Sequence, residues 1–179
     1  MNSSVPVVYL MRGLPGCGKS HKARRLAEHG GLVLETDRYF YTEVGDDPSA
    51  YSFDAKLLPV AREWIFGQFK KAIADRFTPI VLDRGNGRNP ETREFASYAV
   101  EHGYSVRLAE PDSDWWQELR VLLKYKQYVA SEVFDHWAKH LADRTRDEHR
   151  VPTETIRHWM LSWRQDLTVD DILDLDTES

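Results

Sequence analysis

The stretch that decides the fold is YLMRGLPGCGKSHKARRLAE, residues 9–28. Its first residues end the continuous apolar run VPVVYLM (5–11), which is typical of a buried parallel strand. After the glycine-rich segment, KSHKARRLAE has the composition of a helix, and the paired glycines of HGG suit its C-terminal end. The stretch therefore predicts a strand, a glycine-rich loop and a helix in direct succession.

The loop matches the pattern G-x-x-x-x-G-K-[ST] at every fixed position; its residues are Gly13, Leu14, Pro15, Gly16, Cys17, Gly18, Lys19 and Ser20. Glycines leave room for a loop to curl round a phosphate group, so that backbone N–H groups point inward beside a helix N-terminus. All eight residues are therefore expected to bind ATP. Lys19 is expected to reach the β- and γ-phosphates, and Ser20 to be a ligand of Mg²⁺.

The rest of the chain alternates between apolar runs and helical patterns. Strands are predicted at 32–37, 79–83 and 104–111, helices at 54–76 and 89–103, and helical structure from 112 to about 163 with a break near 147–152. This alternation predicts an α/β fold, with a mostly parallel sheet flanked by helices in three layers. We expect a single domain over residues 1–179, with a helical lid or insert at about 112–152 and an acidic C-terminal tail at about 166–179.

Composition restricts the class of protein. The 179 residues are 41% hydrophobic and 30% charged, and the single cysteine excludes an internal disulfide and fits a reducing, cytoplasmic location. The N-terminus does not resemble a secretory signal, and no apolar run approaches the roughly 20 residues that span a bilayer, so we expect no membrane partner. A net charge of −5 argues against broad nucleic-acid binding but leaves room for a local phosphate site.

Two acidic residues follow predicted strands, Asp37 in LETDRYF and Asp83 in PIVLDRGN. Ligands of open parallel sheets bind beyond the carboxyl ends of the strands, and a kinase needs one carboxylate as a base and help in holding Mg²⁺. Arg38, Arg84 and Arg88 flank these acids and suggest an acceptor that itself carries phosphate. The structural alternatives are turn or helix caps for the acids and solvated surface charge for Arg84 and Arg88.

Together these segments resemble the P-loop kinases of the polynucleotide 5′-hydroxyl kinase type, and also related P-loop proteins of unassigned substrate. The resemblance runs from about residue 7 to 172 through RGLPGCGKSHKARRL, ETDRYF, PIVLDRGNGRNPETRE, VEHGYSVRLAEPDSDWW and RVPTETIRHWMLSW. It implies that Lys19 and Ser20 hold phosphate and metal. It also implies that Asp37 is the general base, and that Asp83 matches the acid that ends the third strand. We expect Asp83 to help hold the metal and to contribute to the acceptor site.

Three features depart from that family's pattern. The family often has a second acid where this chain has Arg38, and the usual Thr-Asn after Asp83 is replaced by RGNGR. Extra sequence follows Trp116, so spacing leaves both Arg144 and Arg146 open as the catalytic arginine of the lid. Because phosphoryl transfer needs cations near the transferring group, at least one is expected to reach the triphosphate.

The predicted function is transfer of the γ-phosphate of ATP to a hydroxyl group, at the 5′ end of a nucleic acid or on a nucleotide-like molecule. One alternative is a small-molecule kinase. Another is a non-catalytic, ATP-gated interaction module in which the acidic tail docks a partner, although a solvated tail is the simpler expectation.

Overall fold

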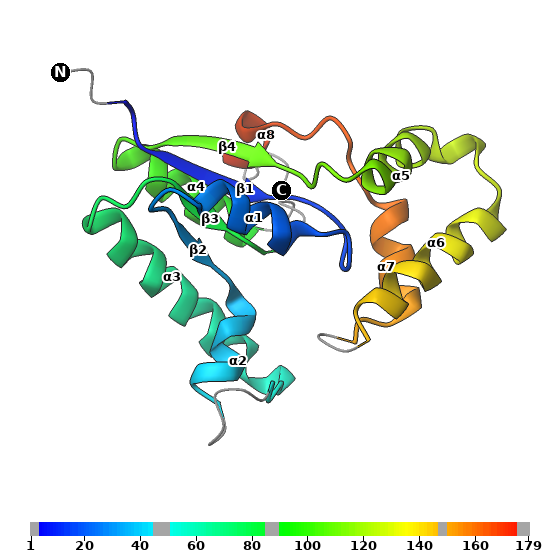
Figure 1. Ribbon diagram of the computed structural model, residues 1–179, viewed down its shortest axis with the longest axis horizontal. Helices are drawn as coiled ribbons and strands as arrows, with labels where there is room; N and C mark the ends of the chain where they lie inside the picture. Colours follow the sequence, from blue (N-terminus) through cyan, green and yellow to red (C-terminus); the bar gives the residue numbers. More distant parts are fainter. Residues whose placement is uncertain (1–3, 45–50, 85–89, 147–149, 175–179) are drawn as a thin grey trace.

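Four short strands form one parallel sheet in the order β2-β3-β1-β4. The computed structural model describes residues 4–44, 51–84, 90–146 and 150–174. The strands are β1 (Val7–Met11), β2 (Leu32–Leu34), β3 (Ile80–Leu82) and β4 (Ser105–Ala109). All run the same way, so their carboxyl ends meet at one edge of the sheet (Figure 1).

Helices connect the strands and extend the chain beyond them. The α-helices are α1 (Lys19–Ala27), α2 (Tyr39–Thr42), α3 (Leu58–Ala74), α4 (Pro90–Glu101), α5 (Asp114–Lys124), α6 (Ser131–Arg144), α7 (Thr153–Leu161) and α8 (Val169–Leu173), and short 3-10 helices are η1 (Thr36–Arg38), η2 (Ala55–Leu57) and η3 (Lys126–Tyr128). The predicted α/β class and the alternation of elements are confirmed. The predicted strand at 32–37 is wrong in its second half, because the chain turns into η1 after Leu34.

The two faces of the sheet are covered by different helices. On one face α3, α4 and α8 pack on the strands through a cluster that includes Val8, Phe69 and Phe95. On the other face α1 packs through Ala23 against Met11 and Val81. The three strands β1, β2 and β3 are thus covered on both faces, which explains their continuous apolar sequences.

Helices α5, α6 and α7, called the helical group from here on, lie beyond the carboxyl ends of β1 and β4 (Figure 1). They have a separate buried cluster, which includes Trp116, Phe134 and Met160. Amphipathic spacing in residues 112–163 predicted helices, and burial of one face in this cluster explains why they form.

A buried arginine joins the helical group to the sheet. Arg12 follows β1 and is 1% exposed. Its Nη1 atom lies 3.3 Å from Oε1 of Glu110, and its Nη2 atom donates a 2.6 Å hydrogen bond to the carbonyl oxygen of Arg164. The guanidinium group also lies 4.3 Å from the ring centroid of Trp163. Since a buried charge without partners is costly, these contacts fix the segment after α7 against the end of β1.

The described part of the acidic tail packs against the domain. Leu167 and Ile172 belong to the cluster under α3 and α4. Thr168 and Asp171 form a capping box that begins α8. The expectation of a solvated tail is therefore wrong at Leu167 and Ile172, which are buried, whereas Thr168 and Asp170 are exposed. None of the helices in the described part of the chain is both long enough and apolar enough to cross a bilayer.

Candidate functional site

The phosphate loop, residues 13–20, connects β1 to the first residues of α1, as the sequence predicted. Gly13, Gly16 and Gly18 have φ angles of 154°, 75° and 93°, a region that residues with a Cβ atom rarely adopt. A Cβ atom on Gly13 would clash with Sγ of Cys17. All three glycines are therefore favoured by backbone conformation, and Gly13 also by close packing inside the loop.

Lys19 lies within the curve of the loop. Its Nζ atom donates hydrogen bonds to the carbonyl oxygens of Gly13 (3.3 Å) and Leu14 (3.1 Å). The ammonium group is thereby placed beside the backbone of the loop and next to the N-terminus of α1. A positive charge beside the N-terminus of a nine-residue helix is an arrangement that binds a phosphate group.

Two residues at unspecified positions of the loop motif are buried in the helical group. Leu14 and Cys17 are each 1% exposed and belong to the same cluster as Trp116 and Leu141. Burial raises the pKa of the Cys17 thiol, and the charge of Lys19 opposes this rise. Cys17 is therefore a packing residue that stays a thiol at neutral pH, and the loop is part of the core of the helical group. Pro15 and Ser20 are half-buried.

The structure separates the two lid arginines that spacing left open. Arg144 ends α6, and its Nε atom donates a 2.8 Å hydrogen bond to the carbonyl oxygen of Gly16. Its guanidinium group lies 4.8 Å from the ring centroid of Trp115. Arg146 instead forms a 2.6 Å ion pair with Asp143, and its side chain is 70% exposed. Arg144 is thus the one of the two that contacts the phosphate loop.

Two carboxylates lie side by side at the ends of β2 and β3. The backbone N–H of Asp83 donates to the carbonyl oxygen of Leu34 (2.9 Å), so the strand pairing continues one residue past β3 and brings Asp83 beside Glu35. Burial raises the pKa of Glu35, and the charge of Asp83 raises it further. The sequence analysis did not identify Glu35 as a site residue. It follows β2 as Asp83 follows β3, so the two residues have equivalent positions at the ends of paired strands.

Asp83 is 8% exposed, and its Oδ2 atom has no hydrogen-bond partner among the described residues. A buried carboxylate oxygen without a donor suits a bound cation, and carboxylate and hydroxyl oxygens are the ligands that Mg²⁺ prefers. Asp83 and the hydroxyl group of Ser20 at the start of α1 therefore fit the predicted metal. Protein side chains alone do not form a cage: no group of three or more His, Cys, Asp or Glu suited to a metal occurs in the described part of the chain.

Asp37 lies in the 3-10 turn that follows β2. The hydroxyl group of Tyr51 donates a 3.4 Å hydrogen bond to its Oδ1 atom. Burial raises the pKa of Tyr51, and the negative charge of Asp37 adds to the rise, so Tyr51 remains a protonated donor. Tyr51 was not identified from the sequence, since 14 residues separate it from Asp37 and no motif links them.

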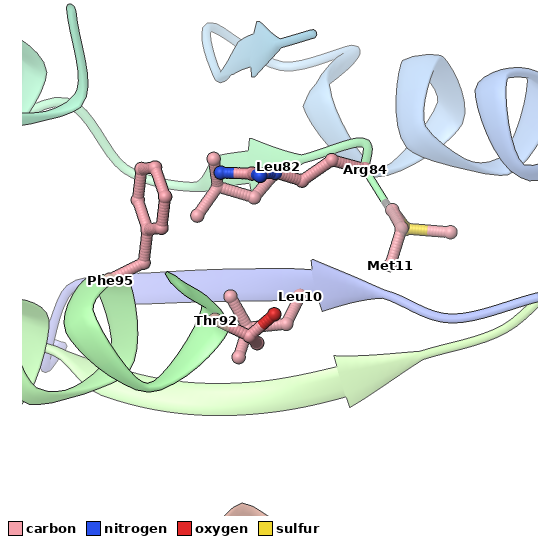
Figure 2. A pocket seen from close by; sticks show the side chains of 6 residues that line it. All are labelled: Leu10, Met11, Leu82, Arg84, Thr92 and Phe95. Carbon is pink, nitrogen blue, oxygen red and sulfur yellow. The ribbon is translucent and has the colours of Figure 1, made fainter. Parts of the chain in front are cut away.

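The three arginines expected to bind an acceptor have different positions. Arg38 is exposed and follows Asp37 directly. Arg84 points back along β3, as Figure 2 shows, into a cavity of about 10 Å³ beneath α4, with its guanidinium group 5.1 Å from the ring centroid of Phe95. In this arrangement Arg84 packs against the sheet. Arg88 lies outside the described residues.

A family model described as an AAA domain matches residues 8–165. Human NEDD4-binding protein 2 is 39% identical over 113 residues, which is 62% of this chain and 6% of that protein. Human YLP motif-containing protein 1 is 37% identical over 129 residues, 60% of this chain and 6% of that protein. The chain thus spans only a small part of the length of these relatives.

The fold is shared with a chain from a solved structure of the Pnkp1/Rnl/Hen1 RNA repair complex. The two superpose with a TM-score of 0.50 at 15% sequence identity, over 99% of this chain and 47% of that chain. At this level of identity the likeness concerns the arrangement of strands and helices.

Proposed function

We propose that this chain, which belongs to the AAA domain family, is an ATP-dependent phosphotransferase whose acceptor is a hydroxyl group on a nucleic-acid 5′ end or a nucleotide-like molecule. The observation that carries the proposal is the position of the acids at the sheet edge. Asp37 and Asp83 follow β2 and β3 at the same edge from which the phosphate loop follows β1. This edge is where open parallel sheets bind their ligands.

The proposed chemistry is in-line phosphoryl transfer. Asp37 accepts the proton of the acceptor hydroxyl group, the acceptor oxygen forms a bond to the γ-phosphorus, and the bond from that phosphorus to the β–γ bridging oxygen breaks to release ADP. The backbone of the loop and Lys19 bind the phosphates. Arg144, which already contacts the loop, stabilises the negative charge of the transferring group.

Ser20 and Asp83 would hold Mg²⁺, which when bound neutralises charge on the β- and γ-phosphates. Tyr51 would orient the carboxylate of Asp37 through its hydrogen bond to Oδ1. Arg38 is proposed to bind an anionic group of the acceptor. Arg84 and Arg88 are further candidates for this role, although Arg84 packs on Phe95. Arg146, the alternative to Arg144 at the triphosphate, pairs with Asp143.

The test is a transfer assay with radiolabelled ATP and 5′-hydroxyl DNA and RNA oligonucleotides, single- and double-stranded, beside a panel of small alcohols. Wild-type protein is expected to label the oligonucleotides. Lys19→Ala is expected to lose both labelling and ATP binding. Tight ATP binding without any product would instead support the ATP-gated module, and labelling of a small alcohol alone would support a small-molecule kinase.

A further inference from the structure

Two tyrosines are exposed in the connection between α5 and α6, at the end of α5 that lies away from β4 (Figure 1). Tyr125 ends α5 and is 48% exposed, and Tyr128 in η3 is 82% exposed. Nζ of Lys124 lies 5.3 Å from the ring centroid of Tyr125. We refer to Lys124, Tyr125 and Tyr128 together as the η3 surface.

The backbone that carries these rings is held in place. Leu123 on one side of them is buried in the cluster of the helical group, and Val129 on the other side packs against that cluster. Nζ of Lys126 donates hydrogen bonds to the carbonyl oxygens of Leu161 (2.6 Å) and Trp163 (2.7 Å), which join η3 to the end of α7. A fixed segment thus presents the rings to solvent, so a ligand that binds them pays little for ordering the chain.

The sequence round the rings is basic. Residues 119–131 and 155–165, the two segments that Lys126 joins, contain no Asp or Glu, although the net charge of the chain is −5. Their Lys and Arg residues are Arg120, Lys124, Lys126, Arg157 and Arg164. The three arginines pair with acids from other segments. Lys124 has no ion-pair partner within the ranges that the structure describes, so its charge remains available beside Tyr125.

Single-stranded nucleic acid is the partner that suits exposed tyrosine rings beside a lysine. Every base has an aromatic face that stacks on such a ring, and the phosphate next to it attracts an ammonium group. A duplex keeps its base faces covered within its own stack. An apolar protein segment would cover the rings but would leave the charge of Lys124 without a partner.

We propose that the η3 surface binds single-stranded nucleic acid, with bases stacked on Tyr125 and Tyr128 and a phosphate group bound by Lys124. The acidic character of the whole chain restricts such binding to a local surface. The surface is separate from the phosphate loop. Trp115 in the first turn of α5 contacts Arg144 beside that loop, whereas η3 follows the other end of α5, roughly 17 Å away for a helix of 11 residues.

The test uses a fluorescently labelled single strand of about 12 nucleotides with a 5′-phosphate, which offers no 5′-hydroxyl group to the active site. Anisotropy at low salt is expected to give a Kd of about 10⁻⁴–10⁻⁶ M. Tyr128→Ala is expected to raise Kd about 5-fold or more, the usual effect of losing one stacked base. Tyr128→Phe keeps the ring and is expected to bind as wild type does. Circular dichroism checks that both variants are folded.

Two further comparisons separate stacking from charge. An abasic oligomer with the same number of phosphates is expected to bind wild type and Tyr128→Ala equally. Lys124→Gln is expected to reduce the slope of log K against log salt by about 0.7, as for one phosphate contact on a single strand. Lys139→Gln is the matched control, since Lys139 is exposed on α6 outside the η3 surface, and its slope is expected to equal that of wild type.

The outcomes are distinct from those of the transfer assay. Equal Kd of wild type and Tyr128→Ala for the single strand overturns the η3 proposal, even where 5′-hydroxyl oligonucleotides are phosphorylated. Binding that depends on Tyr128, without transfer from ATP, supports the η3 surface and counts against the proposed kinase. Self-association that Tyr128→Ala abolishes, with no binding of the single strand, assigns the surface to a protein interface and overturns the proposal.

Discussion

Arg144 and Gly16 are joined by a 2.8 Å hydrogen bond from Nε to the backbone carbonyl oxygen, which fixes the end of α6 to the middle of the phosphate loop. The guanidinium group also packs on the ring of Trp115, so a hydrogen bond and an aromatic contact together fix its position. If the loop binds phosphate as proposed, an arginine held against it is positioned before the reaction begins, which is the condition for strong stabilisation of developing charge.

Arg144→Ala is therefore expected to reduce kcat for transfer by roughly 100-fold or more. Arg146→Ala is the comparison variant, because that side chain is mostly exposed and pairs with Asp143; its kcat is expected to stay within about 3-fold of wild type, as for a surface ion pair. Steady-state kinetics with a labelled oligonucleotide measure both. A larger loss for Arg146→Ala would give the catalytic role to that residue.

Asp37→Asn is expected to keep ATP affinity and to lose transfer by about 10²- to 10⁴-fold, since an amide cannot accept the acceptor's proton. Asp75→Asn, an exposed residue after α3 at the opposite end of the sheet, serves as control. Calorimetry measures ATP binding, and the transfer assay measures kcat. Wild-type kcat in Asp37→Asn would exclude Asp37 as the base.

Gly16→Ala and Gly18→Ala test the close contact between loop and helix. Both positions have positive φ, so each substitution is expected to cost about 1–2 kcal/mol of stability. Only at Gly16 would the new Cβ meet neighbours, 2.9 Å from the carbonyl oxygen of Leu141 and 3.1 Å from Cβ of Arg144. Gly16→Ala is therefore expected to lose a further 1–3 kcal/mol or so in urea unfolding. Equal losses would mean that α6 moves away freely.

Glu35→Gln is expected to raise the melting temperature at pH 8. The pKa of Glu35 in the folded protein lies above its ordinary value of 4.5, chiefly because of burial, so the ionised form disfavours the folded state. Its contribution to stability is complete below the ordinary pKa and is lost as pH rises through the raised value. The difference in Tm between variant and wild type should therefore vanish near pH 4. Glu118→Gln, exposed on α5, should match wild type at pH 8.

The parts of the site that the sequence predicted are those set by local order along the chain. The loop of residues 13–20, strands β1, β3 and β4, and Asp83 depend on contiguous patterns, and each lies where the pattern placed it. Strand β2 ends earlier than its pattern predicted. Glu35 was missed because only the pairing of β2 with β3 brings it beside Asp83. The two residues are far apart in the sequence, and no local pattern encodes that pairing.

Contacts between distant segments account for the other differences. Spacing left Arg144 and Arg146 equivalent, and only the packing of α6 on the loop distinguishes them. Arg84 was expected at the acceptor, but Phe95 of α4 offers its guanidinium group an aromatic surface beneath the helix. Tyr51 reaches Asp37 through a fold-back of the chain, whose anchor is the 3.0 Å hydrogen bond from the N–H of Ser52 to the carbonyl oxygen of Phe40.

Leu14 and Cys17 belong both to the loop that is proposed to bind a nucleotide and to the hydrophobic interior of α5–α7. The conformation of the loop is consequently coupled to the packing of α5–α7, because neither side chain can leave that interior without exposing apolar surface to water. Substitutions that change side-chain volume elsewhere in this cluster, for example at Phe134 or Met160, should therefore alter nucleotide affinity by disturbing the packing of Leu14 and Cys17.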